Sequence, residues 1–154
     1  MGKNKKYDVP ATHRVAVGAY IFDDDGRMLL LHRRNPPRIY APPGGRLEPD
    51  ENPNDGILRE VYEESGISIK LLGPAFIWFG QIVADTPSFI GIDYIAKAFT
   101  TDVVLSDEHD DFLWADKIKI SSGEITTITA DGYGYDPQKI IEAFELYNLL
   151  IPIL

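Results

Sequence analysis

The sequence has no cysteine among its 154 residues. This absence excludes disulfide bonds, thiolate ligands for a metal ion and a cysteine nucleophile. It leaves the cellular compartment open, because proteins without disulfides are found in oxidising and reducing compartments alike. Any catalytic or metal-binding chemistry must therefore proceed without a thiol.

Long apolar runs and an excess of positive charge are also missing. No segment approaches the roughly 18 consecutive apolar residues that span a bilayer. The basic start of the chain has no apolar segment behind it, as a secretory signal would. The net charge is −9, whereas general nucleic-acid or anionic-membrane binders are usually basic. We therefore expect a cytoplasmic protein that binds neither nucleic acid stably nor a membrane, with residues 1–10 as a flexible tail.

The sequence predicts one α/β domain over residues 1–154, because it has no internal repeat and no linker long enough to divide it. Helices are predicted over 53–65 and 136–150, the second with Asp136 as N-cap and Pro137 in its first position. Strands interspersed with helices indicate a mixed β-sheet with helices on its faces. The predicted strands cover 13–22, 27–34, 67–72, 75–84, 89–100 and 112–120, and 106–112 is predicted to be an acidic loop.

Three carboxylates are crowded within the predicted helix 53–65. Asn52 is placed to cap this helix and Gly66 to end it. An amphipathic helix should turn its apolar face to the core and its charged face away from it. We expect Ile57, Leu58, Val61 and Tyr62 to face the core, and Glu60, Glu63 and Glu64 to share the opposite face.

The crowding of these glutamates needs an explanation, because like charges one turn apart destabilise a helix. A solvated acidic face is the simple alternative. A divalent cation accounts for the crowding better, since Mg²⁺ binds carboxylates, waters and substrate phosphates. A carbonyl from the glycine turn at 44–45 could complete its shell. Cationic side chains upstream could then hold a phosphate tail; they are His32, Arg33, Arg34, Arg38 and Arg46.

From Gly45 to Ile67 the sequence also resembles the Nudix box. That pattern asks for Gly, five residues, Glu, seven residues, and then Arg-Glu-apolar-x-Glu-Glu-x-Gly-apolar. Here it is met by Gly45, by Glu51 and by "REVYEESGI" over 59–67. A chance match to so many fixed positions is on the order of one in 10⁸ for each starting point. The match covers about a sixth of the chain.

The resemblance implies a fold, an activity and a set of site residues. Nudix hydrolases are αβα sandwiches that hydrolyse a nucleoside diphosphate linked to another moiety, usually with Mg²⁺ or Mn²⁺. By this resemblance Arg59 would pair with Glu51 and orient the site, and Glu60 or a downstream acid, for which Glu108 is our choice, would act as base. His109 is expected to be a surface residue or a minor substrate contact and not a metal ligand. The metal ligands implied are Gly44 through its carbonyl, Glu60, Glu63 and Glu64, and the substrate-binding residues expected are Arg33, Arg34, Arg46 and Tyr40.

The substrate is less well defined than the reaction. The proline and tyrosine that mark ADP-ribose and dinucleoside polyphosphate hydrolases beyond the box are replaced by Val83 and Ala84. A nucleoside triphosphate or related nucleotide is then favoured by elimination. Aromatic side chains that could stack on a base are Tyr40, Trp78, Phe79, Tyr133 and Tyr135; we expect Trp78 or Phe79 to lie in the core and both loop tyrosines to be exposed.

Two alternatives to a nucleotide pyrophosphohydrolase make different demands on the sequence. A Nudix fold could bind a nucleotide or a protein without catalysis, but such a binder would not need all three glutamates of the box. Isopentenyl diphosphate isomerases use a related fold and a catalytic cysteine, which this chain lacks. The apolar tail 148–154 is expected to dock on the core or to form a homodimer contact.

Overall fold

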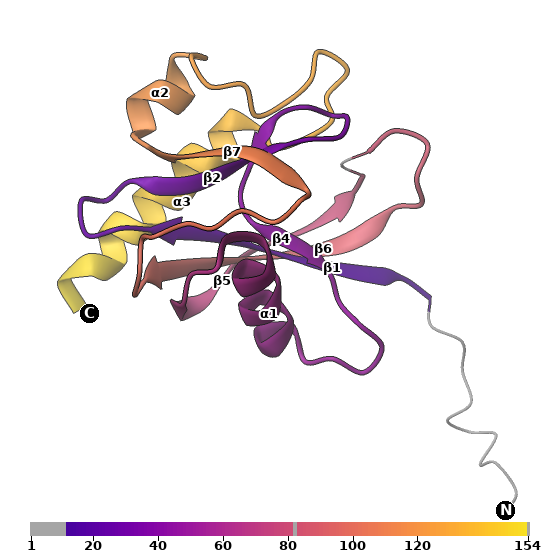
Figure 1. Cartoon of the computed structure of the whole chain (residues 1–154), viewed down its shortest axis with the longest axis horizontal. Helices are drawn as coiled ribbons and strands as arrows, with labels where there is room; N and C mark the ends of the chain where they lie inside the picture. The colour runs from indigo at the N-terminus through magenta and orange to yellow at the C-terminus, as the bar shows by residue number, and fades with distance from the viewer. Residues whose placement is uncertain (1–11, 82, 154) are drawn as a thin grey trace, which may run out of the picture.

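The structure is a computed structural model that describes residues 12–81 and 83–153. Figure 1 shows a mixed sheet with helices on both sides, as the sequence predicts. The central path of the sheet runs β3-β2-β1-β6-β5, with β4 paired to β1 and β7 paired to β2. The strands are β1 (Arg14–Phe22), β2 (Met28–Arg33), β3 (Tyr40–Ala41), β4 (Gly44–Arg46), β5 (Ile69–Gly80), β6 (Phe89–Ala98) and β7 (His109–Ala115). The helices are α1 (Pro53–Ser65), α2 (Lys117–Ser121), α3 (Pro137–Leu150) and the 3₁₀ turn η1 (Ile151–Ile153).

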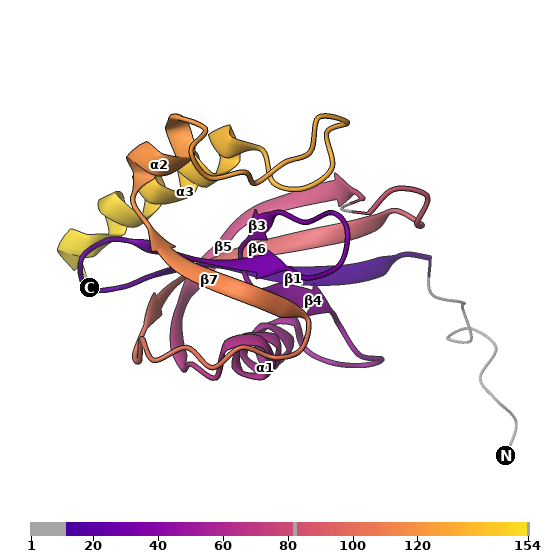
Figure 2. The ribbon, with the colours of Figure 1, turned by 45° about the horizontal axis from the view of Figure 1, so that its top comes forward.

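Both faces of the sheet are buried, so the fold has two apolar cores. In Figure 2, α1 covers one face and α2 with α3 covers the other. Because successive strand residues point to opposite faces, Leu29 and Leu31 of β2 belong to the core under α1, whereas Met28 and Leu30 belong to the core under α3. The layer order helix, sheet, helix is the αβα sandwich that the resemblance implied.

The strand β1 divides the sheet into two branches. It pairs in parallel with β6 along its whole length, from Arg14 with Phe89 to Phe22 with Lys97. On its other side it pairs with β4 over residues 16–18 and meets β2 only where Phe22 faces Met28. The sheet therefore forks along β1, and β2 with β7 forms the second branch.

Helix α1 has the boundaries that the sequence predicts. The Asn52 side chain accepts a hydrogen bond from the Asn54 N–H at 2.9 Å, and Gly66 ends the helix with a positive φ of 69°. The predicted faces were partly wrong, because Leu58 and Tyr62 are exposed and Glu64 is buried. Glu64 lies seven residues after Ile57, which is within about 20° of two whole turns, so it shares the core-facing side of the helix.

Three strand predictions also need correction. The separate strands over 67–72 and 75–84 are one strand, β5, with irregularities around Gly73 and Pro74. As β5 is an edge strand, it tolerates a proline without losing a central ladder bond. Residues 109–112 of the predicted acidic loop are already β7, and the predicted continuation of that strand is the short helix α2.

Two further predictions concern the ends of the chain. Residues 1–10, predicted to be a flexible tail, lie outside the described residues. The described part of the apolar tail, residues 148–153, does not dock on the core as a unit, because Leu149 and Ile153 are exposed while Leu150 packs against the α3 core. Within 12–81 and 83–153, none of the helices has the length and apolar content needed to cross a membrane.

Candidate active site

Two glycines of β4 bring the backbone against the glutamates of α1. The Gly44 N–H donates to Glu64 Oε1 at 2.8 Å. A Cβ on Gly45 would lie only 2.5 Å from the Glu60 carboxylate, and one on Gly44 would collide with the Val17 carbonyl and come within 2.8 Å of the Gly18 Cα. Position 44 is therefore restricted to glycine by close approach of the backbone, whereas a side chain at position 45 would displace the end of Glu60.

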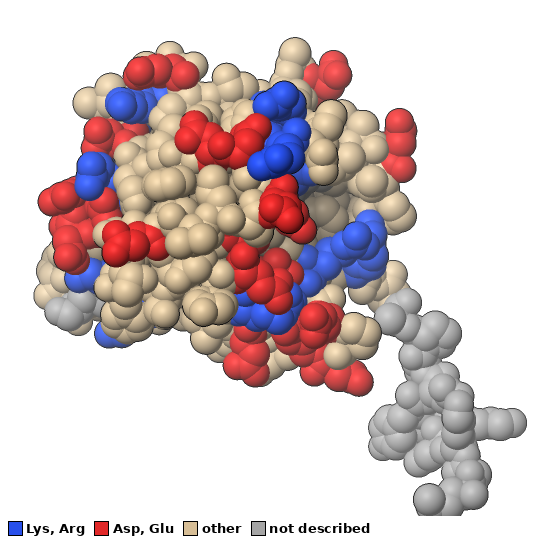
Figure 3. Space-filling view, viewed as in Figure 1, with Lys and Arg blue, Asp and Glu red and all other residues tan. Residues whose placement is uncertain are grey.

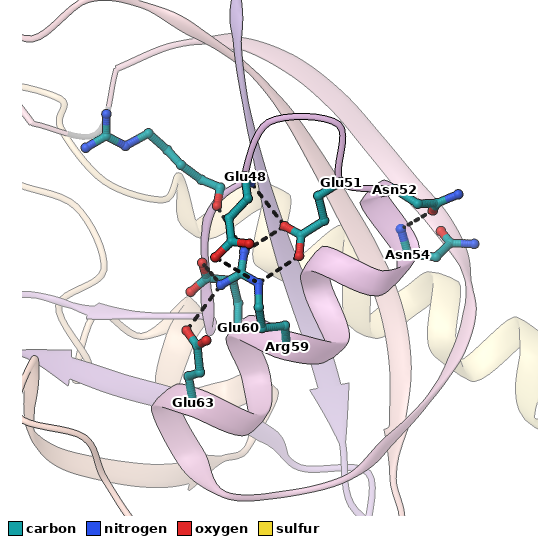
Figure 4. Close-up of polar contacts among 8 residues, drawn as sticks. Glu48, Glu51, Asn52, Asn54, Arg59, Glu60 and Glu63 are labelled. Carbon is teal, nitrogen blue, oxygen red and sulfur yellow. Dashed lines mark hydrogen bonds and ion pairs between the residues drawn. The ribbon is translucent and has the colours of Figure 1, made fainter.

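Arg59 organises the carboxylates on the outer side of this contact (Figure 4). Its Nε and Nη2 donate to the two oxygens of Glu51 at 2.8 and 2.7 Å, which is the pairing expected from the resemblance. Its Nη1 donates to Glu60 at 2.9 Å and to Glu63 at 3.2 Å. Hydrogen bonds from Arg59 lower the pKa of Glu51 to about 2. The guanidinium thus relieves part of the repulsion between the glutamates.

Glu64 is the most buried acid of the site. Burial raises its pKa to about 8, the Gly44 N–H acts against that rise, and the carboxylates of Glu60 and Glu108 add to it. Its Oε2 lies 3.3 Å from His109 Nε2. Burial, followed by the positive charge of Arg33, lowers the pKa of His109 to about 4. A negative charge on Glu64 is therefore poorly stabilised by the protein alone.

Acidic groups from two distant parts of the chain line one cavity. Its lining is Glu60, Glu63 and Glu64 from α1 and Ser106, Asp107 and Glu108 from the segment before β7. One ligand atom from each of Glu64, Glu108 and His109 lies within 4.8 Å of the others. A surface position for His109 is wrong, since this side chain is buried beside Glu64, whereas a minor contact with substrate stays a prediction. Carboxylate oxygens in this arrangement fit a hard divalent cation.

A second cavity, of about 440 Å³, adjoins the first because Glu64 and Glu108 line both. Of the expected substrate-binding residues, Arg33 and Arg46 lie in its wall, together with Gly44 and Gly45. Figure 3 shows acidic and basic side chains close together over α1. One cavity therefore presents carboxylates and the next presents arginines.

Two expected substrate-binding residues lie away from this cavity. The Tyr40 hydroxyl donates to Asp111 Oδ2 at 2.6 Å, and Tyr40 is absent from the cavity lining. Arg34 is exposed, and its Nη2 lies 3.5 Å from the His109 carbonyl oxygen. The Tyr40 side chain thus joins β3 to β7, and neither Tyr40 nor Arg34 lines the cavity, so a direct contact with substrate is not supported for either.

Sequence reasoning missed several residues of the cavity. Asp93 is buried on β6, and Arg14 lies at the start of β1. A lone carboxylate within the apolar strand "FIGIDYIAKA" was a signal that could have identified Asp93. Trp78 and Tyr135 also line the cavity, whereas Phe79 is exposed. The prediction that Trp78 or Phe79 lies in the core was therefore wrong. The prediction that Tyr133 and Tyr135 are exposed was also wrong, because both side chains are half-buried.

The pKa of Glu64 predicts how the stability of the metal-free protein varies with pH. Because the folded pKa of about 8 exceeds the ordinary value of 4.5, the folded state binds the proton more tightly than the unfolded state. This contribution to stability is therefore present below pH about 4.5 and is lost as the pH rises through about 8. In EDTA, the Tm of the wild type should fall relative to Glu64→Gln by about 5 °C between pH 5 and 8.5. Thermal unfolding of both proteins checks this, and parallel curves would contradict it.

Comparisons with known proteins agree with the resemblance. The family model described as NUDIX domain matches residues 12–120. A MutT-like protein of Streptomyces ambofaciens is 38% identical over 71 residues, which cover 46% of each chain. An m7GpppN-mRNA hydrolase of Bos taurus is 43% identical over 56 residues, 33% of this chain and 18% of that one. The matches thus span less than half the length of these curated relatives.

A solved structure gives the same architecture. The crystal structure of a NUDIX-family hydrolase from Clostridium perfringens superposes with a TM-score of 0.72 at 19% identity, covering 89% of this chain and 99% of the other. At that identity the likeness concerns the fold alone. The family model, however, matches well over half of the chain and includes the whole glutamate helix. The chain therefore belongs to the Nudix hydrolase family.

Proposed function

We propose that the chain is a pyrophosphohydrolase that uses Mg²⁺ or Mn²⁺ to cleave a diphosphate bond in a nucleotide or nucleotide derivative. The observation that carries this proposal is the shared wall of the two cavities. Glu64 and Glu108 line both the acidic cavity and the arginine-lined one. A phosphate chain held by the arginines would therefore extend directly to the carboxylates that hold the cation.

The residues of the acidic cavity fit a divalent cation. Its ligands in this proposal are Glu60, Glu63 and Glu64, assisted by the Gly44 carbonyl. When bound, the metal supplies charge neutralisation on the phosphate oxygens and a more acidic bound water. The raised pKa of Glu64 supports this assignment, because a buried carboxylate without a full counter-charge gains most from a cation.

The side chains divide the remaining tasks. Arg33 and Arg46 bind phosphate oxygens, and Arg59 fixes Glu60 and Glu63 through its contact with Glu51. Water attacks a phosphorus atom, its proton passes to a carboxylate, and the bond to the bridging oxygen breaks, leaving two phosphate products. Glu108 is the better base than Glu60, because Arg59 already donates to the Glu60 carboxylate. Such a reaction depends mainly on positioning and charge neutralisation.

A phosphate-release screen tests the proposed activity. It presents NTPs, dNTPs, ADP-ribose, NADH, dinucleoside polyphosphates and nucleotide sugars, each with Mg²⁺, with Mn²⁺ and with EDTA. We expect at least one substrate to be hydrolysed with metal and not with EDTA, and Glu108→Gln to lower its kcat by about 10² or more. Glu124→Gln is the matched control, because Glu124 is an exposed residue beyond β7.

A folded protein that hydrolyses none of these compounds would contradict the proposal and favour the binding-module alternative. A thermal-shift scan with the same compounds would then identify a bound ligand. The cytoplasmic location, the absence of nucleic-acid binding and the homodimer stay predictions, which fractionation, gel-shift and light-scattering measurements address.

A further inference from the structure

The arginine-lined cavity contains four buried nitrogen atoms that have no hydrogen-bond partner among the described residues. Within residues 12–81 and 83–153, the buried side-chain nitrogens and oxygens without a hydrogen-bond partner are Arg14 Nε, Arg33 Nε, Trp78 Nε1 and His109 Nδ1. All four residues line this one cavity. Buried polar groups in folded proteins normally have partners. The pattern therefore indicates a ligand that supplies hydrogen-bond acceptors, as phosphate oxygens do for the arginines.

One end of the same cavity is shaped for a flat ring. Trp78 of β5 lies over Gly91 of β6, where any Cβ would collide with the indole. Phe89 packs edge-to-face against that indole, with ring centroids 5.0 Å apart. On the neighbouring strand, Ala16 lies opposite Gly91. The indole therefore fills the space over these small residues, and a second ring would stack on its other face, within the cavity that Trp78 lines.

Asp93 stands at this end of the cavity with incomplete hydrogen bonding. It is only 5% exposed, and the Tyr20 hydroxyl donates to its Oδ2 at a long 3.4 Å. Its Oδ1 lies 2.9 Å from the place that a Cβ on Gly18 would occupy, and the Trp78 indole N–H lies near this carboxylate without a hydrogen bond of normal geometry. Gly18 thus leaves this oxygen open. A buried carboxylate in this state is costly unless a ligand brings donors.

The charge state of Asp93 agrees with a role as acceptor. Burial raises its pKa to about 6, while the nearby Trp78 indole and Tyr20 hydroxyl act in the opposite direction. At neutral pH the group is therefore mainly ionised, and an ionised carboxylate only accepts hydrogen bonds.

The distance between Asp93 and the phosphate side suits a nucleoside. Gly44 pairs with Gly18, and Gly18 pairs with Asp93 on the next strand. Two strand spacings separate the residues, or about 10 Å. A nucleoside spans a gap of that order between the outer edge of its base and its 5′ phosphate.

The chemistry of the base edge then selects the ligand. A carboxylate is best satisfied by two adjacent N–H donors on one edge. Guanine offers N1–H beside its 2-amino group. Adenine and cytosine place a ring-nitrogen acceptor next to their amino group, and uracil flanks its single N–H with two carbonyls. We infer that Asp93 is a specificity-determining residue that accepts both hydrogen bonds from a guanine ring stacked on Trp78, so that the substrate is a guanine nucleotide. This inference rests on the proposed function.

Binding of nucleoside monophosphates separates this inference from the proposed activity. GMP, IMP and AMP contain no diphosphate bond, so calorimetric titration in Mg²⁺ buffer reports binding without turnover. IMP differs from GMP only by lacking the 2-amino group. We expect GMP to bind at least about 10-fold more tightly than IMP or AMP, as a hydrogen bond to a charged group contributes that much.

The variant Asp93→Asn should reduce the preference for GMP over IMP to about 2-fold or less, since an amide cannot accept both bonds. Asp102→Asn is the matched control, because Asp102 is exposed and outside the cavity. A wild type that binds GMP no better than AMP overturns the inference even if the enzyme hydrolyses other nucleotides. A folded Asp93→Asn variant that keeps the wild-type preference for GMP over IMP also overturns the inference. GMP binding without any hydrolase activity would support the inference and contradict the proposed function.

Discussion

Replacing Glu64 by Gln is expected to lower kcat/KM by about 10³ while leaving the fold intact. Glu64 lies in the wall shared by the acidic and arginine-lined cavities, and its charge would be lost where the cation is held. Removing one group that stabilises transition-state charge costs about 10² to 10³ in rate, and loss of a metal ligand adds to this. The Gln side chain still offers an oxygen to the Gly44 N–H.

Two measurements together test the predicted effects of Glu64→Gln on activity and on folding. Steady-state kinetics on the best substrate of the screen gives the activity, and thermal unfolding in EDTA gives the stability. Glu145→Gln, on the exposed side of α3, is the matched control and should behave as the wild type. If Glu64→Gln retains activity within about threefold, within the usual spread of surface substitutions, the metal site has been assigned to the wrong carboxylates.

Two single variants, in which one glycine of β4 is replaced by alanine, are expected to differ in whether they lose activity alone or activity and stability together. In Gly45→Ala the new Cβ meets only the end of the Glu60 side chain, at 2.5 Å. That carboxylate can rotate away, so the protein should fold while kcat/KM falls by about 10², because a small misplacement of a catalytic group is enough. In Gly44→Ala the Cβ meets the backbone of Val17 and Gly18, which cannot rotate away.

The second variant should therefore lose stability as well as activity. Forcing a methyl group into a packed backbone contact costs about 1–3 kcal/mol or more. Thermal unfolding and kinetics of the two variants provide the check, each serving as the control for the other. Equal stability of Gly44→Ala and wild type would mean that β4 does not lie against β1 in the described position. Full activity of Gly45→Ala would mean that Glu60 is not part of the active site.

Local sequence patterns predicted α1 and its caps well, because Asn52 and Gly66 act within one turn of the helix that they bound. The position of Glu64 was misjudged for a different reason. Its charge suggested solvent, yet its angular position on the helix places it beside Ile57, and the Gly44 N–H makes burial tolerable. A charged residue on an apolar face was itself a sign of function.

The pairing of strands that are distant in the sequence could not be predicted from the sequence. His109 lies against Glu64 because β7 returns to pair with β2, in a register that joins His109 to Arg33. Nothing near His109 in the sequence reveals that neighbour. Asp93 and Trp78 meet for the same reason, through the pairing of β5 with β6. Residues in the cavity were thus found only once strands distant in sequence had been placed.

The fork of the sheet along β1 has a consequence for how the protein folds. The acidic cavity needs α1, which follows β4, and also the segment before β7, which joins only after β2 and β7 have paired across a large separation in sequence. Closing such distant contacts is a late and slow event in folding. A nascent or partly folded chain would therefore carry the complete Nudix box and still lack a complete cation site. High-affinity metal binding would then report completion of the native topology, and refolding followed by metal uptake should lag behind the appearance of helix.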